Sequence, residues 1–178
     1  MSKVILYIAT SLDGYIARPD GNLDWLTSVP NPETGDYGYA ALLERIGAII
    51  MGRKTYDELL GFGIEWPYEG FDTIIVSTDK SLAIKSPDTR VLTDNLTEVV
   101  TALKKQSPKD IWLVGGGQLI NVFIQHGLLD QMIISIVPKI IGDGIPLFPK
   151  NTLQTEWKLV GIQAFNTGLV NVTYEKPV

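Results

Sequence analysis

The sequence predicts an α/β fold with a mostly parallel central sheet, flanked by helices and followed by a C-terminal antiparallel hairpin. Three observations lead to this class. Short apolar runs of strand length alternate with segments of helical periodicity. Two of these runs lead directly into glycines that precede a helical pattern. The last two runs flank Asn166-Thr167-Gly168, which is typical of the turn in a hairpin.

The first half of the chain gives these elements in order. The apolar run Val4–Ala9 predicts a buried strand, and the Gly-, Pro- and Asp-rich residues 13–35 predict a long loop. Apolar residues at helical spacing predict a helix over about Asp36–Ile46, which Gly47 is expected to end. The next segments are a strand at Ala48–Met51, a short helix carrying Tyr56, Leu59 and Leu60, and strands at Phe71–Val76 and Thr89–Leu92.

The second half continues the alternation. An amphipathic helix carries Leu96, Val99, Val100 and Leu103, with Asp94 or Asn95 near its cap. The following segments are a strand at Ile111–Val114, a helix at Gly116–Gln125, and strands at Met132–Val137, Trp157–Phe165 and Leu169–Glu175. In such sheets, ligands bind outside the carboxyl ends of the strands.

Length and composition fit a single domain over residues 1–178. The formal net charge of −5 argues against nucleic acid as the main partner, because phosphate backbones attract basic faces. The chain has no Cys and one His, which excludes thiolate nucleophiles, Cys-based metal sites and multi-His metal sites. The N-terminal apolar run is too short for a signal peptide, and no window is long enough to span a membrane, so we expect a cytoplasmic protein.

The first strand–glycine junction joins Ala48–Met51 to Gly52-Arg53-Lys54-Thr55. Free N–H groups and the positive dipole end at a helix start attract phosphate, and Arg53 and Lys54 add charge. The structural alternative is a tight turn beside two solvated cations. The segment is not a P-loop, because a strand separates Gly47 from Gly52 and Arg53 interrupts the Gly-Lys-Thr ending.

The second junction joins Ile111–Val114 to Gly115-Gly116-Gly117-Gln118. Glycines let a backbone approach a ligand closely, and a helix that starts at Gly116 would direct N–H groups toward it. A Rossmann fingerprint would need a glycine where Ile120 stands. The junction therefore suits a phosphate without matching that motif, and close packing of strand against helix is the structural alternative.

Two more segments are expected near the same edge of the sheet. Ser77, Thr78 and Lys80 follow a strand and suit a 2′-phosphate, although a capped strand-to-turn transition explains them equally well. The loop after the first strand contains Asp24 next to Trp25. Such an Asp is either a desolvated acid with a raised pKa or a turn residue beside a packed aromatic.

Taken in order, these segments resemble dihydrofolate reductase and, more closely, the reductase domain of the bacterial riboflavin-biosynthesis deaminase–reductase. The resemblance covers nearly the whole chain. The segment from Gly142 to Phe148 favours the riboflavin-type branch and its stand-alone relatives. The stretches that carry the resemblance are Ser11–Ala17, Met51–Tyr56, Val114–Gly117 and Pro138–Phe148.

The resemblance implies a dihydrofolate-reductase-like fold and hydride transfer from NADPH. Such a cofactor supplies the reactive group, which suits a chain without Cys. The implied positions are Gly52, Arg53, Lys54 and Thr55 at the pyrophosphate and 2′-phosphate; Gly115, Gly116 and Gly117 at the pyrophosphate, flanked by Val114, Gln118 and Leu119; Ser77, Thr78 and Lys80 at the adenosine end; and Ala9, Ile16 and Ala17 along the nicotinamide.

Dihydrofolate reductases also place an acid early on the helix before the Gly-Arg junction, and Asp36 holds that position here. Asp36 would orient a pterin-like ring or relay a proton, or it would only cap the helix that it begins. Asp24 is the second candidate catalytic acid.

The implied substrate is a small molecule with a heterocyclic C=N bond or a sugar-like carbonyl, such as a ribosylamino-pyrimidine. A dihydropterin substrate is one alternative, and a non-catalytic NADPH-binding module is another. The resemblance also suggests a homodimer, with neither nucleic acid nor membrane as a partner.

Overall fold

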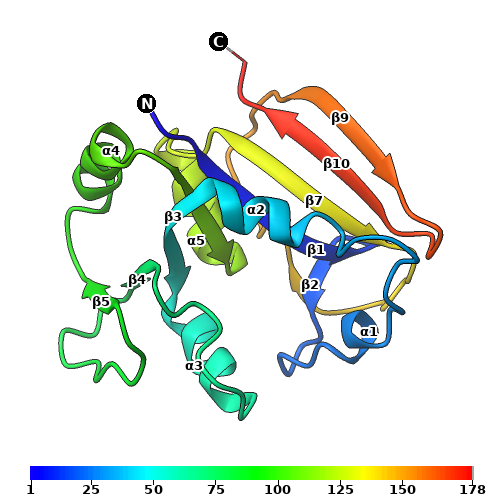
Figure 1. Cartoon of the computed structure of the whole chain (residues 1–178), viewed down its shortest axis with the longest axis horizontal. Coiled ribbons are helices and arrows are strands. Elements are labelled where there is room, and N and C mark those ends of the chain that lie inside the picture. Colours follow the sequence, from blue (N-terminus) through cyan, green and yellow to red (C-terminus); the bar gives the residue numbers. More distant parts are fainter. Residues whose placement is uncertain (178) are drawn as a thin grey trace.

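A computed structural model of the chain describes residues 1–177. An eight-stranded sheet with the order β5-β4-β3-β6-β1-β7-β10-β9 forms its centre (Figure 1). Six strands run parallel, and β10 and β9 add an antiparallel hairpin at one edge, which confirms the predicted architecture. The strands of this sheet are β1 (Val4–Ser11), β3 (Ile46–Gly52), β4 (Asp72–Val76), β5 (Thr89–Leu92), β6 (Asp110–Gly115), β7 (Gln131–Val137), β9 (Lys158–Ala164) and β10 (Val170–Glu175).

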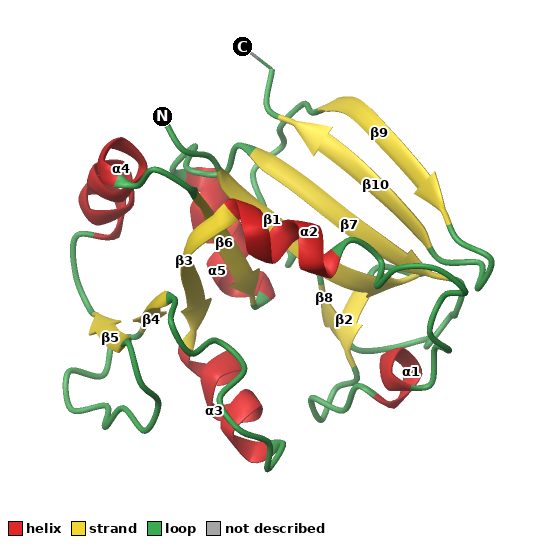
Figure 2. Ribbon diagram, viewed as in Figure 1, coloured by secondary structure: helices red, strands yellow, loops and turns green. Residues whose placement is uncertain are grey.

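Helices cover both faces of the sheet (Figure 2). Side chains alternate along β1, so Leu6 packs with Phe123 on one face and Ile5 packs with Leu42 and Tyr56 on the other. Burial on both faces explains why the parallel strands read as continuous apolar runs. The helices are α1 (Asp24–Thr27), α2 (Tyr39–Arg45), α3 (Arg53–Gly61), α4 (Leu96–Gln106) and α5 (Gly117–Gln125).

The predicted loop over residues 13–35 is more structured than expected. It contains α1 and a short strand, β2 (Tyr15–Ala17), which pairs with β8 (Ile145–Pro146). Both strands are too short to give a recognisable alternation in the sequence. Their pairing brings the segment after β1 against the segment that follows β7.

The helix before β3 differs from the prediction at both ends. Tyr37 and Gly38 have φ values of 62° and 94°, which no helix accommodates, so α2 begins at Tyr39 rather than at Asp36. At the other end Gly47 does not terminate the helix. The backbone is already extended at Ile46, and Gly47 lies inside β3. The glycine signal was therefore assigned to the wrong element.

The parallel strands place four chain segments at one edge of the sheet. β1, β3, β4 and β6 end there at Ser11, Gly52, Val76 and Gly115. This is the edge at which α/β sheets bind their ligands. Within residues 1–177, no helix has both the length and the apolar character that a membrane crossing requires.

Candidate functional site

The two predicted strand–glycine junctions lie side by side at this edge. Met51 of β3 pairs with Gly115 of β6. A Cβ built on Gly52 would lie 3.7 Å from the Gly115 carbonyl oxygen and 3.8 Å from the Gly116 nitrogen. The Thr55 hydroxyl of α3 lies 3.5 Å from a Cβ built on Gly116. The two junctions therefore form one continuous backbone surface.

Each junction opens a helix of nine residues that has no side-chain cap. Gly52 is the N-cap of α3, and Gly116 is the N-cap of α5. Neither helix start receives a hydrogen bond from a capping side chain. Because the first N–H groups of a helix have no acceptor within the helix, two such starts make a site for an anion.

The glycines of the two junctions differ in whether backbone conformation or packing excludes a side chain. Gly52 and Gly116 have φ values of −78° and −84°, which any residue adopts, and a Cβ on either would meet its neighbours at ordinary contact distances of 3.5 Å or more. Gly115 has a φ of 136°, and a Cβ on Gly117 would lie 2.6 Å from the Pro146 carbonyl oxygen. The packing alternative therefore explains Gly117, whereas neither the φ values nor the Cβ contacts require glycine at 52 or 116. Bare backbone at these two positions suits close approach by a phosphate group.

The residues that flank the triple glycine are spread over both faces. Val114 is half-buried and packs on the side of α2 and α3, and Leu119 lies in the first turn of α5 and is buried in the core. Gln118 is exposed at the start of α5. Of the three, only Gln118 is open to a ligand, while Val114 and Leu119 hold the junction in place.

The three residues expected along the nicotinamide do not share one packed cluster. Ala9 packs near Trp25 and Val137, whereas Ile16 packs against the core on the α5 side. Ala17 is buried in the β2–β8 pair, where a Cβ on Gly144 would overlap its carbonyl oxygen. Of the three, Ala9 lies on β1, the strand next to β6 and its glycines.

The adenosine-end residues gather where β4 ends, and most are already paired. The Arg53 guanidinium contacts Asp79 at 2.6 Å and Asp57 at 3.1 Å. Lys80 pairs with Asp94 at 3.2 Å, and the Ser77 hydroxyl accepts the N–H of Asp79 at 3.0 Å. Thr78 and Lys54 are exposed. Asp79, between Thr78 and Lys80, was not among the predicted site residues, although it lies with them and its charge at a strand end was a usable signal.

The loop after β2 reaches across to α3. A Cβ built on Gly21 would lie 2.9 Å from Oε1 of Glu58. Burial raises the pKa of Glu58, and the nearby Lys54 opposes that rise. The loop thus borders the helix whose first turn forms the anion site.

Asp24 is not the desolvated acid that one of the two sequence-based alternatives described. Its carboxylate is exposed and makes two hydrogen bonds with the Arg18 guanidinium, at 2.6 and 3.0 Å. This pairing lowers the pKa of Asp24 instead of raising it. The buried neighbour Trp25 carries the packing, so the turn-residue alternative fits the structure.

Asp36 is occupied in a similar way. One carboxylate oxygen accepts the Ala40 N–H at 2.7 Å, and the other accepts the Gly38 N–H at 3.2 Å. Asp36 therefore caps the first turn of α2 from just outside the helix. The capping alternative accounts for this residue without any role in proton transfer.

A polar network that the sequence reasoning also missed ties the segment before α2 to the sheet. The Tyr7 hydroxyl and the Asn171 side-chain amide both donate to the Tyr37 carbonyl, at 3.2 and 2.6 Å. The Ser135 hydroxyl donates to Asn171 Oδ1 at 2.7 Å. Burial raises the pKa of Tyr7, so its phenol stays protonated. The signal was a lone Ser135 inside the apolar run of β7.

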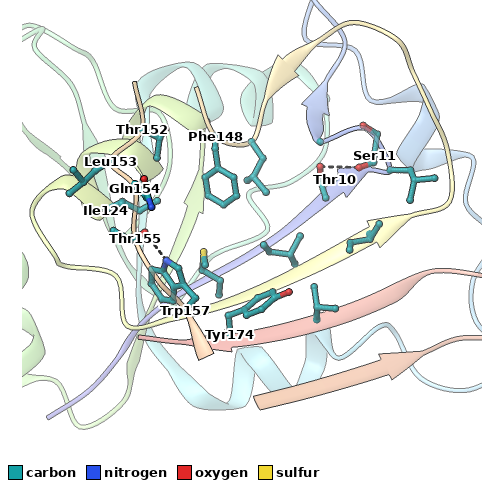
Figure 3. Close-up of a pocket in the computed structure, with 17 residues that line it drawn as sticks. Thr10, Ser11, Ile124, Phe148, Thr152, Leu153, Gln154, Thr155, Trp157 and Tyr174 are labelled. Atoms are coloured by element: carbon teal, nitrogen blue, oxygen red, sulfur yellow. Dashed lines mark hydrogen bonds between the residues drawn. The ribbon is translucent and has the colours of Figure 1, made fainter. Parts of the chain in front are cut away.

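A separate cavity of about 580 Å³ opens on the α5 side of β7 and β10 (Figure 3). Phe148, Trp157 and Tyr174 line it together with apolar residues of β7, and no charged residue contributes to its wall. None of the predicted cofactor residues lines this cavity. The cavity nevertheless reaches the same edge of the sheet, because Thr10 and Ser11 at the carboxyl end of β1 line it. Leu147 also lines it, and a Cβ on Gly117 would lie 3.2 Å from the Leu147 carbonyl oxygen.

Comparison with known proteins gives this geometry a family context. A family model described as the RibD C-terminal domain matches residues 68–171. The Bacillus subtilis (strain 168) protein YwjB is 33% identical over 163 residues, covering 92% of each chain. YyaP of the same strain is 34% identical over 183 residues, covering 97% of this chain and 94% of YyaP.

Solved structures agree with the family match. A protein from Shewanella sp. PV-4 described as a "putative riboflavin biosynthesis protein" is 32% identical, with a TM-score of 0.88 and 99% of each chain covered. A Thermotoga maritima deaminase/reductase shares the fold at 17% identity and a TM-score of 0.69, over 99% of this chain and 57% of that one. The chain therefore belongs to the RibD C-terminal domain family and has its dihydrofolate-reductase-like fold.

Proposed function

We propose that the protein is an NADPH-dependent reductase of the riboflavin-biosynthesis type, which transfers hydride to a small heterocyclic or ribosylamino substrate. The observation that carries this proposal is the pair of uncapped helix starts at Gly52 and Gly116, joined into one surface at the carboxyl edge of the sheet. Two adjacent anion sites suit an extended dinucleotide better than a compact triphosphate. Membership of the RibD C-terminal domain family supports the same assignment.

The residues of the chain would divide the work of binding. The first N–H groups of α3 and α5 would hold the pyrophosphate, and the bare backbone at Gly52 and Gly116 would let it approach. Arg53 would face the 2′-phosphate, while Ala9 would border the nicotinamide. The bound cofactor would supply the hydride, so these residues need only bind and orient.

We favour a ribosylamino-type substrate over a pterin. The pterin alternative rested on a free acid at Asp36, and both oxygens of that carboxylate are bound by the α2 start. The site therefore lacks the free carboxylate at Asp36 that would have supported pterin recognition. Asp24 is likewise held by Arg18, so both expected acids are engaged within the protein.

The test is NADPH oxidation, followed at 340 nm, with 5-amino-6-(5-phosphoribosylamino)uracil and dihydrofolate as substrates. We expect oxidation with the ribosylamino compound and none with dihydrofolate. Turnover of dihydrofolate alone would shift the assignment to a pterin reductase. Tight NADPH binding without oxidation in a broad screen of C=N and carbonyl substrates would favour the non-catalytic module.

We also propose that the protein forms a homodimer through the apolar face of β9 and β10. Ile162 and Leu159 of β9 are 65% and 46% exposed, and they pair with Val172 and Tyr174, which line the uncharged cavity. Leu153, on the opposite rim, is 54% exposed. Exposed apolar side chains beside an uncharged cavity are typical of an interaction face, and a second copy presents the same residues.

A further inference from the structure

The ion pairs of Arg53 bear on which nicotinamide cofactor the site prefers. Arg53 is the first residue of α3, and its guanidinium is held between Asp79 of the segment after β4 and Asp57 of α3. Both carboxylates are partly exposed, so the pairs are open to exchange with another anion. A 2′-phosphate that binds Arg53 therefore has to compete with two carboxylates for the guanidinium.

Asp79 is the more firmly positioned of the two carboxylates. Its Oδ1 accepts hydrogen bonds from the Ser81 N–H at 2.9 Å and the Ser81 hydroxyl at 2.6 Å. Its own N–H donates to the Ser77 hydroxyl at 3.0 Å. The Ser81 bonds, followed by the Arg53 bond, lower the pKa of Asp79, so it stays ionised. Asp79 is therefore a fixed negative charge at the end of β4.

Arg53 is shared between Asp79 and Asp57, so its single positive charge does not neutralise both carboxylates. Lys80, the next cation along the chain, pairs with Asp94. A ribose 2′-hydroxyl can donate a hydrogen bond to a carboxylate, whereas a 2′-phosphate is repelled by one. The two nicotinamide cofactors differ at this group alone, so a carboxylate here discriminates between them.

We propose that Asp79 is a specificity-determining residue, which holds Arg53 back from the 2′-phosphate and limits the preference for NADPH over NADH. This inference rests on the proposed function. On NADPH binding, the Arg53 guanidinium exchanges the Asp79 carboxylate for the phosphate. On NADH binding, the Arg53–Asp79 pair stays intact.

The test measures dissociation constants of NADPH and NADH by fluorescence titration of the wild type and Asp79→Asn. The amide keeps the shape of the side chain and an acceptor for Ser81, so the variant should fold. We expect NADPH to bind roughly fivefold more tightly to Asp79→Asn, because the variant removes a negative charge that competes with the phosphate for Arg53. NADH affinity should change less than about twofold.

Asp72→Asn is the matched control. Asp72 pairs with Arg90 at 3.0 Å with similar exposure, at the amino end of the same strand. The Asp72→Asn substitution removes the same charge at a place away from the site, so the NADPH affinity of this variant should match that of the wild type. In the double variant Arg53→Ala with Asp79→Asn, the gain should disappear.

Three outcomes would overturn the inference. Equal shifts for NADPH and NADH in Asp79→Asn would show that the carboxylate does not sense the 2′-phosphate. An equal gain in Asp72→Asn would assign the effect to net charge. A wild type that binds neither cofactor would overturn the proposed function and this inference with it, whereas either of the first two results would leave the proposed function standing.

Discussion

At the scale of single residues, the candidate acids make hydrogen bonds within the protein instead of remaining free for a ligand. Each of the two acids expected to be catalytic is engaged locally, Asp24 by Arg18 and Asp36 by the start of α2. The sequence showed that an Asp stood at each position and offered capping or turn roles as alternatives. It could not choose between them, because the choice depends on which N–H or guanidinium lies within hydrogen-bond distance.

Asp36 gives the prediction at this scale. Asp36→Ala removes the acceptor for Gly38 and Ala40, so the free energy of unfolding should fall by about 1 kcal/mol. Asp36→Asn keeps an acceptor oxygen and should lose less. Urea unfolding of the three proteins measures the difference. If Asp36→Ala is as stable as the wild type, the cap contributes nothing and a functional role for Asp36 regains support.

At the scale of elements, the sequence predicted the strands and helices well where apolar patterns are long. It failed for β2 and β8, whose pairing is set by tertiary contact, and at Gly47, where a glycine inside a strand imitates a helix end. It located both glycine junctions, since a strand followed by glycine and a helix is a local pattern. It could not separate the glycines that serve packing from those that leave backbone bare.

This separation leads to a stability prediction. In Gly117→Ala the new methyl would meet the Pro146 and Leu147 carbonyl oxygens at 2.6 and 3.2 Å, which should lower the free energy of unfolding by about 1–3 kcal/mol. Gly61→Ala, at the end of α3, places a methyl in open space and should be neutral or stabilising by up to about 1 kcal/mol. Urea unfolding again provides the measurement. Equal stabilities for the two variants would show that Gly117 is not required by packing.

At the scale of the whole molecule, the sequence predicted one sheet with helices on both faces, and the structure confirms this arrangement. The uncovered face beyond β7 was not evident, because β10 alternates apolar and polar residues as a half-buried strand does. β9 itself is exposed along nearly its whole length. Only the register shows that Ile162, Val172 and the cavity wall form one apolar surface.

The oligomeric state tests the role of that surface. Ile162→Lys places a charge in the proposed interface and should convert a dimer into a monomer, as measured by light scattering after size-exclusion chromatography. Ile140→Lys is the control, because Ile140 is 73% exposed and contributes neither to the cavity wall nor to β9. A wild type that is monomeric, or an Ile162→Lys protein that stays dimeric, would contradict the proposed interface.

We expect the bare backbone at Gly52 and Gly116 to bind the pyrophosphate of NADPH, and one titration tests this directly. NADPH fluorescence should saturate with the wild type, and Gly116→Ala should bind more weakly by roughly tenfold or more, because its methyl would occupy the space of the phosphate. The same methyl meets Thr55 at an ordinary contact distance of 3.5 Å, so the variant should keep the fold and most of its stability. Equal NADPH affinity in Gly116→Ala, or no saturable binding to the wild type, would contradict the account.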